Sequence, residues 1–229
     1  MIAIISIFAA IVGNLVLFRI SSLKQGVFLF QKHRNGSTLM ACIFLRNKIA
    51  GFTILGLIPG LIVLITDPQL FTQFGLSLLY SSDYLSLVGL LPLIVGINYF
   101  LAKYPATMKR YPEMRFTEWT KSRLAALVSG WTLYLLGYEF LFRGLLFFSV
   151  YQSSGLWASI IVNVVIYSAA HYPKGKAEMF GAIPFGILLC YVALLTGSFI
   201  LPFLIHLSLA LSTDLFSIRN NPEMKIVRS

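Results

Sequence analysis

The chain has 229 residues, of which 58% are hydrophobic and only 11% are charged. Soluble globular chains carry about 25% charged residues, so this composition excludes a soluble domain and, with a mean hydropathy of +0.82, favours a membrane protein. The net charge of +10 does not indicate nucleic-acid binding, because the basic residues lie between apolar segments rather than along one face. That placement is typical of the cytoplasmic loops of membrane proteins.

Seven apolar segments approach the roughly 20 residues that a bilayer-crossing helix needs. The first, residues 2–18, has no basic residue before it, whereas Arg19 and Lys24 follow it. A cleavable signal has the opposite polarity, so we predict that this segment is the first span. The other candidates are 49–66, 84–102, 126–150, 157–171, 179–196 and 199–216. Residues 38–48 can either extend the second helix or form an eighth, partial span. The sequence therefore predicts an all-α polytopic membrane helix bundle of seven or eight transmembrane helices, in a single domain over residues 1–229.

The charges of the connecting loops alternate along the chain. Basic residues occur in loops 19–48, 103–123 and 172–178 and in the tail after 216, and they are absent from 67–83, 151–156 and 197–198. The positive-inside rule then predicts a cytoplasmic C-terminus. Short loops with this bias favour a multi-pass protein of a bacterial inner membrane. Residues 21–38 and 103–123 mix aromatic and basic residues, which is typical of amphipathic segments on the anionic leaflet of the bilayer.

The ionisable residues inside predicted spans include Glu139, His171 and His206, which lie on three separate segments. An acid at the centre of a bilayer costs at least a few kcal/mol, so three such groups on three segments suggest a shared polar pocket. Counted from the outer ends of their helices, they lie about 18, 21 and 12 Å deep, which permits them to meet. The alternative is local pairing, of Glu139 with Arg143 one turn on and of the histidines with backbone carbonyls.

The residues around these groups form three motifs in order. Tyr138-Glu-Phe-Leu-Phe-Arg-Gly144 resembles the Glu-Glu-x-x-x-Arg motif of the CAAX-protease and bacteriocin-processing family (CPBP, or Abi) of intramembrane proteases. Tyr167-Ser-Ala-Ala-His171 is similar to the aromatic-x-x-x-His motif of that family, and His206 resembles the histidine of its last motif. The resemblance covers about residues 120–217, which we expect to form the protease core.

Two positions depart from the family pattern. Tyr138 stands where the family has its first glutamate, which is usually assigned as the base that activates water. Ala210 stands where the family has Asn or sometimes Asp. Asp214 cannot simply replace it, because it follows His206 by eight residues, which turn its side chain by about 80° and carry it about 12 Å along the helix. Either Glu139 has taken over the role of the base, or catalysis is reduced or lost.

The resemblance implies an enzyme, a peptide hydrolase that cuts a hydrophobic peptide or a membrane protein in the lipid bilayer. A carboxylate in a cavity of low dielectric can act as general base towards water, the role implied for Glu139, and Arg143 can hold that carboxylate ionised and oriented. His171 and His206 can donate hydrogen bonds to the oxyanion of the attacked peptide carbonyl. Tyr138 and Tyr167 supply phenolic donors in the same region.

Three alternatives stay open. Two histidines and a glutamate form a common zinc set, but the chain has no His-Glu-x-x-His helix and the ligands would come from three helices, so we favour a mechanism without a metal cofactor. A catalytically inactive relative could use the same pocket as a membrane binding or scaffold protein. A small transporter would also place ionisable residues at mid-membrane, although the sequence has no inverted repeat that would favour transport.

Overall fold

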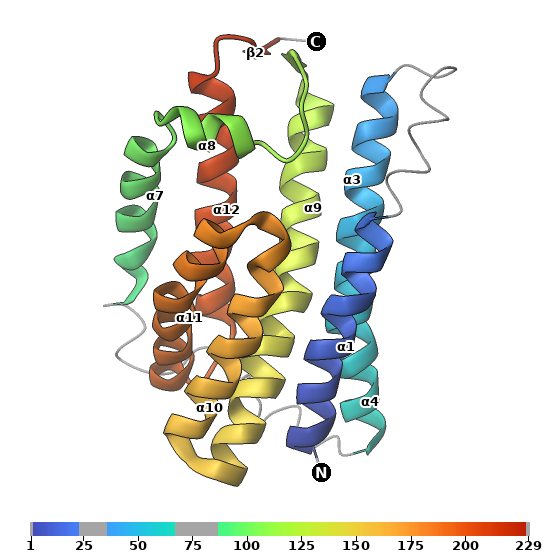
Figure 1. Ribbon diagram of the computed structural model, residues 1–229, viewed down its shortest axis with the longest axis vertical. Helices are drawn as coiled ribbons and strands as arrows, with labels where there is room; N and C mark the ends of the chain where they lie inside the picture. Colours follow the sequence, from blue (N-terminus) through green and yellow to red (C-terminus); the bar gives the residue numbers. More distant parts are fainter. Residues whose placement is uncertain (1, 23–35, 67–86, 228–229) are drawn as a thin grey trace.

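The computed structural model describes residues 2–22, 36–66 and 87–227, and nearly all of these residues are helical (Figure 1). The α-helices are α1 Ile2–Ser22, α3 Gly36–Phe52, α4 Ile58–Thr66, α7 Leu90–Leu101, α8 Pro105–Arg110, α9 Lys121–Glu139, α10 Phe147–His171, α11 Lys176–Thr196 and α12 Ile200–Asn220. Two π-helical turns, η2 Thr53–Leu57 and η3 Phe140–Leu146, continue helices, and the 3₁₀ turn η4 Tyr172–Lys174 follows α10. The strands are β1 Glu118–Trp119 and β2 Lys225–Ile226.

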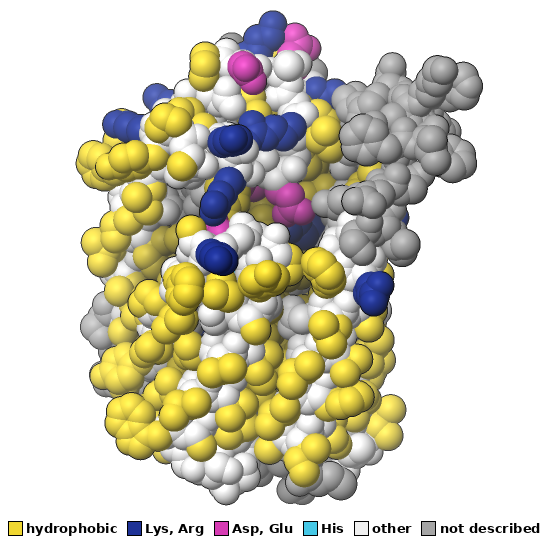
Figure 2. Space-filling model, viewed as in Figure 1, with side chains coloured by type: hydrophobic (Ala, Val, Ile, Leu, Met, Phe, Trp, Pro, Cys, Tyr) yellow, Lys and Arg dark blue, Asp and Glu magenta, His cyan; other side chains and the backbone are white. Residues whose placement is uncertain are grey.

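Five helical stretches of the described residues are long and apolar enough to cross a membrane. They are Ile2–Ser21, Leu39–Thr66, Lys121–Lys174, Lys176–Thr196 and Ile200–Asn220. Many large apolar side chains on their outer faces are exposed. Figure 2 shows apolar side chains spread over much of the visible surface, whereas Lys and Arg lie mainly in its upper part. This distribution is that of a multi-pass membrane protein, with lipid in contact with the apolar faces. The predicted helical membrane fold is confirmed, whereas the count of seven or eight spans is not.

The second span is a single long helix. Residues 38–48, which were ambiguous in sequence, belong to the stretch Leu39–Thr66 of 28 residues and do not form a separate span. Its turn η2 lies against α9, where a Cβ atom on Gly56 would come within 2.6 Å of the Gly137 Cα. Small residues allow helix backbones to approach closely in membranes. This contact fixes the position of α9 relative to the second span just before Glu139.

The 54-residue stretch Lys121–Lys174 contains two legs rather than one long helix. Gly155 within α10 has φ +83° and ψ 178°, a conformation that glycine adopts far more readily than other residues. In Figure 1 the chain reverses there, so that α9 and η3 run in one direction and most of α10 returns in the other. The uncharged turn predicted at 151–156 therefore lies at this reversal.

The predicted span 84–102 is represented among the described residues mainly by α7, which has 12 residues. A helix of that length extends about 18 Å, less than the roughly 30 Å of the hydrocarbon core. Helix α7 packs against α12. Residues 67–86, which include most of the predicted loop 67–83, lie outside the described residues.

The connection 103–123 differs from the expected interfacial segment. Met114, Phe116 and Trp119 are buried in the protein core, so these apolar side chains do not lie on the lipid surface. Strand β1 pairs in parallel with β2 of the C-terminal tail, with Trp119 opposite Ile226. The sequence did not predict this pair, which places the connection and the tail on the same side of the bundle, as the loop charges require. Most of the other expected interfacial segment, 21–38, lies outside the described residues.

Candidate active site

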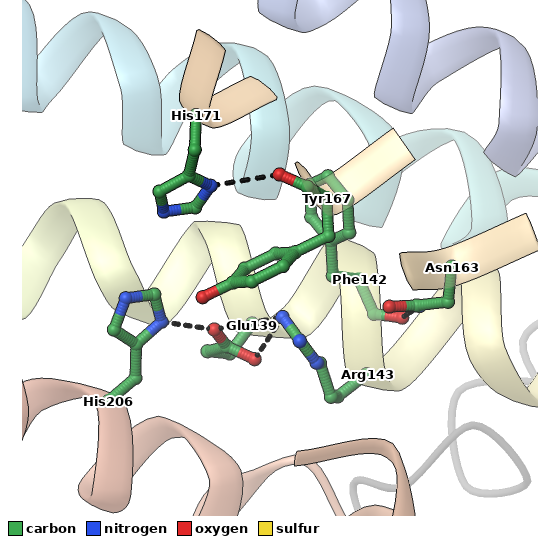
Figure 3. Close-up of polar contacts among 7 residues, drawn as sticks. All are labelled: Glu139, Phe142, Arg143, Asn163, Tyr167, His171 and His206. Atoms are coloured by element: carbon green, nitrogen blue, oxygen red, sulfur yellow. Dashed lines mark hydrogen bonds and ion pairs between the residues drawn. The ribbon is translucent and has the colours of Figure 1, made fainter. Parts of the chain in front are cut away.

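The carboxylate of Glu139 lies at the centre of a buried polar cluster, shown in Figure 3. Its Oε1 atom is 2.5 Å from His206 Nδ1, and Arg143 Nη1 lies 3.2 Å from Oε1 and 3.1 Å from Oε2. Glu139 and Arg143 are fully buried, and His206 is 8% exposed. Because a carboxylate oxygen only accepts hydrogen bonds, His206 Nδ1 carries the hydrogen of this contact. The structure therefore brings three of the predicted site residues together: Glu139 from the end of α9, Arg143 from η3 and His206 from α12.

The guanidinium of Arg143 is held from a second side by Tyr167. Its Cζ atom lies 4.2 Å from the centroid of the Tyr167 ring, within the range of a cation–π contact. The turn η3 that carries Arg143 is braced by a buried amide on α10, since Asn163 Nδ2 donates to the Phe142 carbonyl over 2.5 Å. A π-helical turn disturbs the regular ladder of backbone bonds and often occurs at functional sites. The brace and the ring together fix the direction of Arg143.

The aromatic rings of Tyr138 and Tyr167 enclose His206. Each ring centroid lies 6.1 Å from that of the imidazole, with the rings edge to face. Tyr138 also stacks on Phe142 at 4.4 Å, and its hydroxyl makes no hydrogen bond within the described part of the chain. The residue that replaces the first glutamate of the family motif is thus buried beside His206, where its ring packs and supplies no base.

His171 lies on the far side of Tyr167 from the Glu139 carboxylate (Figure 3). Its Nδ1 atom donates to the Tyr167 carbonyl over 2.8 Å, and its ring centroid is 4.6 Å from the Tyr167 ring. This is the backbone pairing that the sequence left open for the histidines. It does not separate His171 from the site, because Nδ1 alone is engaged and the ring faces the same cavity as His206.

A cavity of about 400 Å³ adjoins the cluster. Tyr167, His171 and His206 line it, whereas Glu139 and Arg143 do not and lie behind them. The expectation that all four charged or imidazole groups line one cavity is therefore only partly met. The reason is packing, since the rings of Tyr167 and His206 stand between the carboxylate and the open space. Within the described part of the chain, His206 is the member of the Glu139–His206 pair that a cavity water can reach.

Ala210 and Asp214, which follow His206 on α12, differ in whether they line the cavity. Ala210 lines the cavity, so the site lacks the side-chain amide that the family has there. Asp214 is fully buried and accepts a hydrogen bond from Trp131 Nε1 over 2.8 Å. It faces away from the cavity and does not replace the missing group.

Two asparagines of the site were missed in the sequence. Asn163 braces η3, as described above, and Asn98 of α7 lines the cavity. Each stands alone in an apolar run, a signal of the same kind as the one that singled out Glu139. Applied to amides as well as to ionisable groups, that criterion would have found both.

No group of three or more His, Cys, Asp or Glu side chains within the described ranges is arranged to hold a metal ion. In the zinc set considered in the sequence, the Tyr167 ring separates His171 from Glu139, and His206 Nδ1 is already bonded to Glu139. The donors as arranged therefore do not fit the three-ligand set that catalytic zinc prefers.

The three motifs lie within a part of the chain that matches a known protein family. Residues 119–211 match the family model described as type II CAAX prenyl endopeptidase Rce1-like. The match includes Glu139, His171 and His206, and it confirms the resemblance to the CAAX-protease family that the three motifs predicted. The matched family consists of endopeptidases, which are peptide hydrolases. No curated protein and no solved structure matches the chain.

Proposed function

Because residues 119–211 are similar to CAAX prenyl endopeptidases, we propose that the protein is an intramembrane endopeptidase that hydrolyses a peptide bond of a membrane-associated peptide or protein. The observation that carries the proposal is the 2.5 Å contact between His206 Nδ1 and Glu139 Oε1 at the edge of the cavity. A buried carboxylate that orients an imidazole, whose second nitrogen is open to a cavity, is a unit that can activate water.

The tautomers of the two histidines decide what each can do. Nδ1 of His206 donates to a carboxylate and Nδ1 of His171 to a carbonyl, so in a neutral ring each Nε2 is an acceptor. In Figure 3 these second nitrogens lie on the facing sides of the two rings. Because both residues line one cavity, the proposal assigns one water to this site, which donates one hydrogen to each Nε2 atom. This differs from the oxyanion role implied by the family resemblance, since a neutral ring whose N–H is engaged has no second N–H to donate.

The proposed reaction runs through His206. The water oxygen attacks the carbonyl carbon of the peptide bond while its proton passes to His206 Nε2. Glu139 stabilises the imidazolium that forms, and Arg143 keeps the carboxylate ionised and oriented. When the C–N bond breaks, the imidazolium returns the proton to the leaving amine. Tyr167, whose ring lines the cavity, supplies the phenolic hydrogen that can stabilise the oxyanion.

The proposed reaction needs no metal cofactor, in line with the donor arrangement of the site. It predicts that a chelator leaves cleavage unchanged and that the purified protein carries no stoichiometric zinc. Zinc at one equivalent per chain, with loss of cleavage when it is removed, would contradict the metal-free reaction.

The location follows from the same features. The protein is a multi-pass membrane protein, and the basic connections support a bacterial inner membrane, with residues 103–123 and the C-terminal tail in the cytoplasm.

The test uses the full chain reconstituted in lipid nanodiscs. The probes are an internally quenched, farnesylated peptide that ends in Cys-aliphatic-aliphatic-X and its unprenylated counterpart, incubated in H₂¹⁸O. We expect cleavage, with one ¹⁸O in the new carboxylate as seen by mass spectrometry. Absence of cleavage of both peptides, in a preparation that stays folded, would reject the proposal for this substrate class.

A second function is favoured by Tyr138 and Ala210, which replace two polar groups of the family motifs. An inactive relative would bind a membrane partner in the same pocket without cutting it. Such a protein would bind the probe peptides equally well with Glu139 or Gln at position 139 and would release no product.

A further inference from the structure

Asn98 is a buried polar residue on the cavity wall to which α7 and α12 contribute. It is 4% exposed, and it lines the cavity together with His171 and His206. No motif of the sequence includes it, and it lies outside the residues 119–211 matched by the family model. Its role must therefore be read from its contacts.

The amide nitrogen of Asn98 is fully engaged with α12. Nδ2 lies 2.9 Å from the Leu209 carbonyl, 2.8 Å from Ser212 Oγ and 3.0 Å from Thr213 Oγ1. Because the Leu209 carbonyl can only accept, these contacts fix which end of the amide faces α12. Nδ2 has two hydrogens and no capacity left for a ligand.

The other end of the amide, Oδ1, is open. No donor within the described part of the chain bonds to it, and it is not among the side-chain atoms that are both sealed off and unpartnered. A carbonyl oxygen at the surface of a cavity in a membrane protein loses free energy unless a donor reaches it. Cavity water supplies this donor before a ligand binds, and a ligand that displaces the water must replace it. A peptide can do so, because it carries one N–H per residue, whereas lipid tails carry no donor.

We infer that Asn98 Oδ1 accepts a hydrogen bond from a backbone N–H of the peptide substrate and so positions the peptide beside His206. The inference rests on the proposed peptidase function and names a positioning residue for it. Ala210 offers no polar group on the same wall, and the Thr213 hydroxyl donates to the Leu209 carbonyl over 2.7 Å. Among the described side chains of α7 and α12 on this wall, Asn98 Oδ1 is thus an acceptor that remains for a ligand.

The spacing along α12 indicates which N–H is held. Leu209 and Thr213 follow His206 by three and seven residues, or about 4.5 to 10.5 Å along the helix. An extended peptide advances about 3.3 Å per residue. The bonded N–H therefore belongs to a residue within about three positions of the cleaved bond.

The experiment replaces single peptide N–H groups by oxygen. A series of fluorescent versions of the farnesylated probe carries one ester in place of an amide at each of the three positions on either side of the cleaved bond. Binding to the full chain in nanodiscs is measured by anisotropy, with Glu139→Gln in all proteins to prevent turnover. We expect one ester to bind about 3- to 10-fold more weakly than the amide, as the loss of one hydrogen bond predicts.

Variants at position 98 complete the cycle. Asn98→Leu should bind that ester and the amide equally, while Asn98→Asp, which keeps an acceptor, should retain the preference for the amide. Asn14→Leu is the matched control, because Asn14 Nδ2 donates to the Ala10 carbonyl and lines a different cavity. A general loss of folding weakens the binding of the amide and of the ester alike, so the ratio of their affinities stays unchanged.

The outcomes separate the inference from the proposed function. Equal binding of every ester and the amide, a preference that survives in Asn98→Leu, or absence of binding would each overturn the role of Asn98. A preference that depends on Asn98 without cleavage by the wild-type chain would uphold this role and reject the peptidase. Cleavage by the wild-type chain without a preference for the amide would uphold the peptidase and reject the role of Asn98.

Discussion

The imidazole of His206 and the carboxylate of Glu139 lie 67 positions apart in the chain and 2.5 Å apart in space, between Nδ1 and Oε1. The contact is buried, and Arg143 holds the carboxylate from the other side. As a result, His206 faces the cavity with its second nitrogen while its first is fixed. The first two predictions test this relationship directly.

Glu139→Gln keeps the shape of the side chain and removes its charge. Because the imidazolium loses its counter-charge and the tautomer of His206 is no longer fixed, we expect the cleavage rate of the farnesylated probe to fall by about 10²- to 10⁴-fold. Glu118→Gln, at an exposed pair with Lys225, is the matched control and should keep full activity. If Glu139→Gln retains full cleavage and His206→Ala loses it, Glu139 is structural; if both retain it, the protease assignment fails.

His206→Gln distinguishes a base from an oxyanion donor. Glutamine offers an N–H but cannot take up a proton near neutral pH. A base role predicts loss by about 10²- to 10⁴-fold, close to that of His206→Ala, in steady-state assays on protein that elutes as the wild type does. If His206→Gln stays within a few-fold of wild type while His206→Ala is impaired, His206 acts as a donor to the oxyanion, the role implied by the family resemblance.

Lys48→Met should destabilise the fold. Lys48 Nζ lies 2.8 Å from Glu113 Oε2 and 3.2 Å from the centroid of the Trp131 ring, and the side chain is 7% exposed. We expect the free energy of unfolding to fall by about 1 to 3 kcal/mol, measured by chemical unfolding in micelles. Lys225→Met, which breaks a largely exposed pair with Glu118, should cost less than about 1 kcal/mol. Equal losses in both variants would show that the buried Lys48 contacts add nothing.

Gly56→Ala should disturb the approach of η2 to α9. The added methyl would meet the Gly137 backbone at 2.6 Å, so one helix must shift and displace Glu139 two residues later. We expect a lower midpoint of thermal unfolding, by the equivalent of about 1 to 3 kcal/mol, together with slower cleavage. Gly96→Ala, whose methyl would meet nothing within 4 Å, is the control. A Gly56→Ala protein as stable and active as Gly96→Ala would contradict this account.

The topology can be checked with single cysteines. Because β1 pairs with β2, cysteines placed at Thr117 and Glu223 should react with an impermeant reagent from the same side, and the loop charges predict the cytoplasmic side. The background for labelling is a chain in which both native cysteines are replaced by serine or alanine. Reaction of position 117 from the outside would reject the predicted orientation.

The sequence by itself determined the class of the protein and the residues of the three motifs. Hydropathy follows from the order of residues alone, so the helical membrane fold and the turns at 151–156 and 197–198 could be predicted without any knowledge of packing, although the number of spans could not. The glutamate and the two histidines were conspicuous because ionisable groups are costly in a bilayer. The same criterion would have found Asn98 and Asn163 had it been applied to amides.

Only the tertiary structure decided how these residues meet. Whether a side chain faces lipid, a neighbouring helix or a cavity depends on helix rotation, which here follows from the close approach of Gly56 to Gly137 and from the π-helical turn η3. Gly56 and Gly137 lie 81 positions apart, and neither their contact nor the turn η3 leaves a mark in local hydropathy. They place the Glu139 carboxylate behind the ring of His206 and the amide of Asn98 on the cavity wall, because packed side chains, and not their order in the chain, determine which polar atoms water or a substrate can reach.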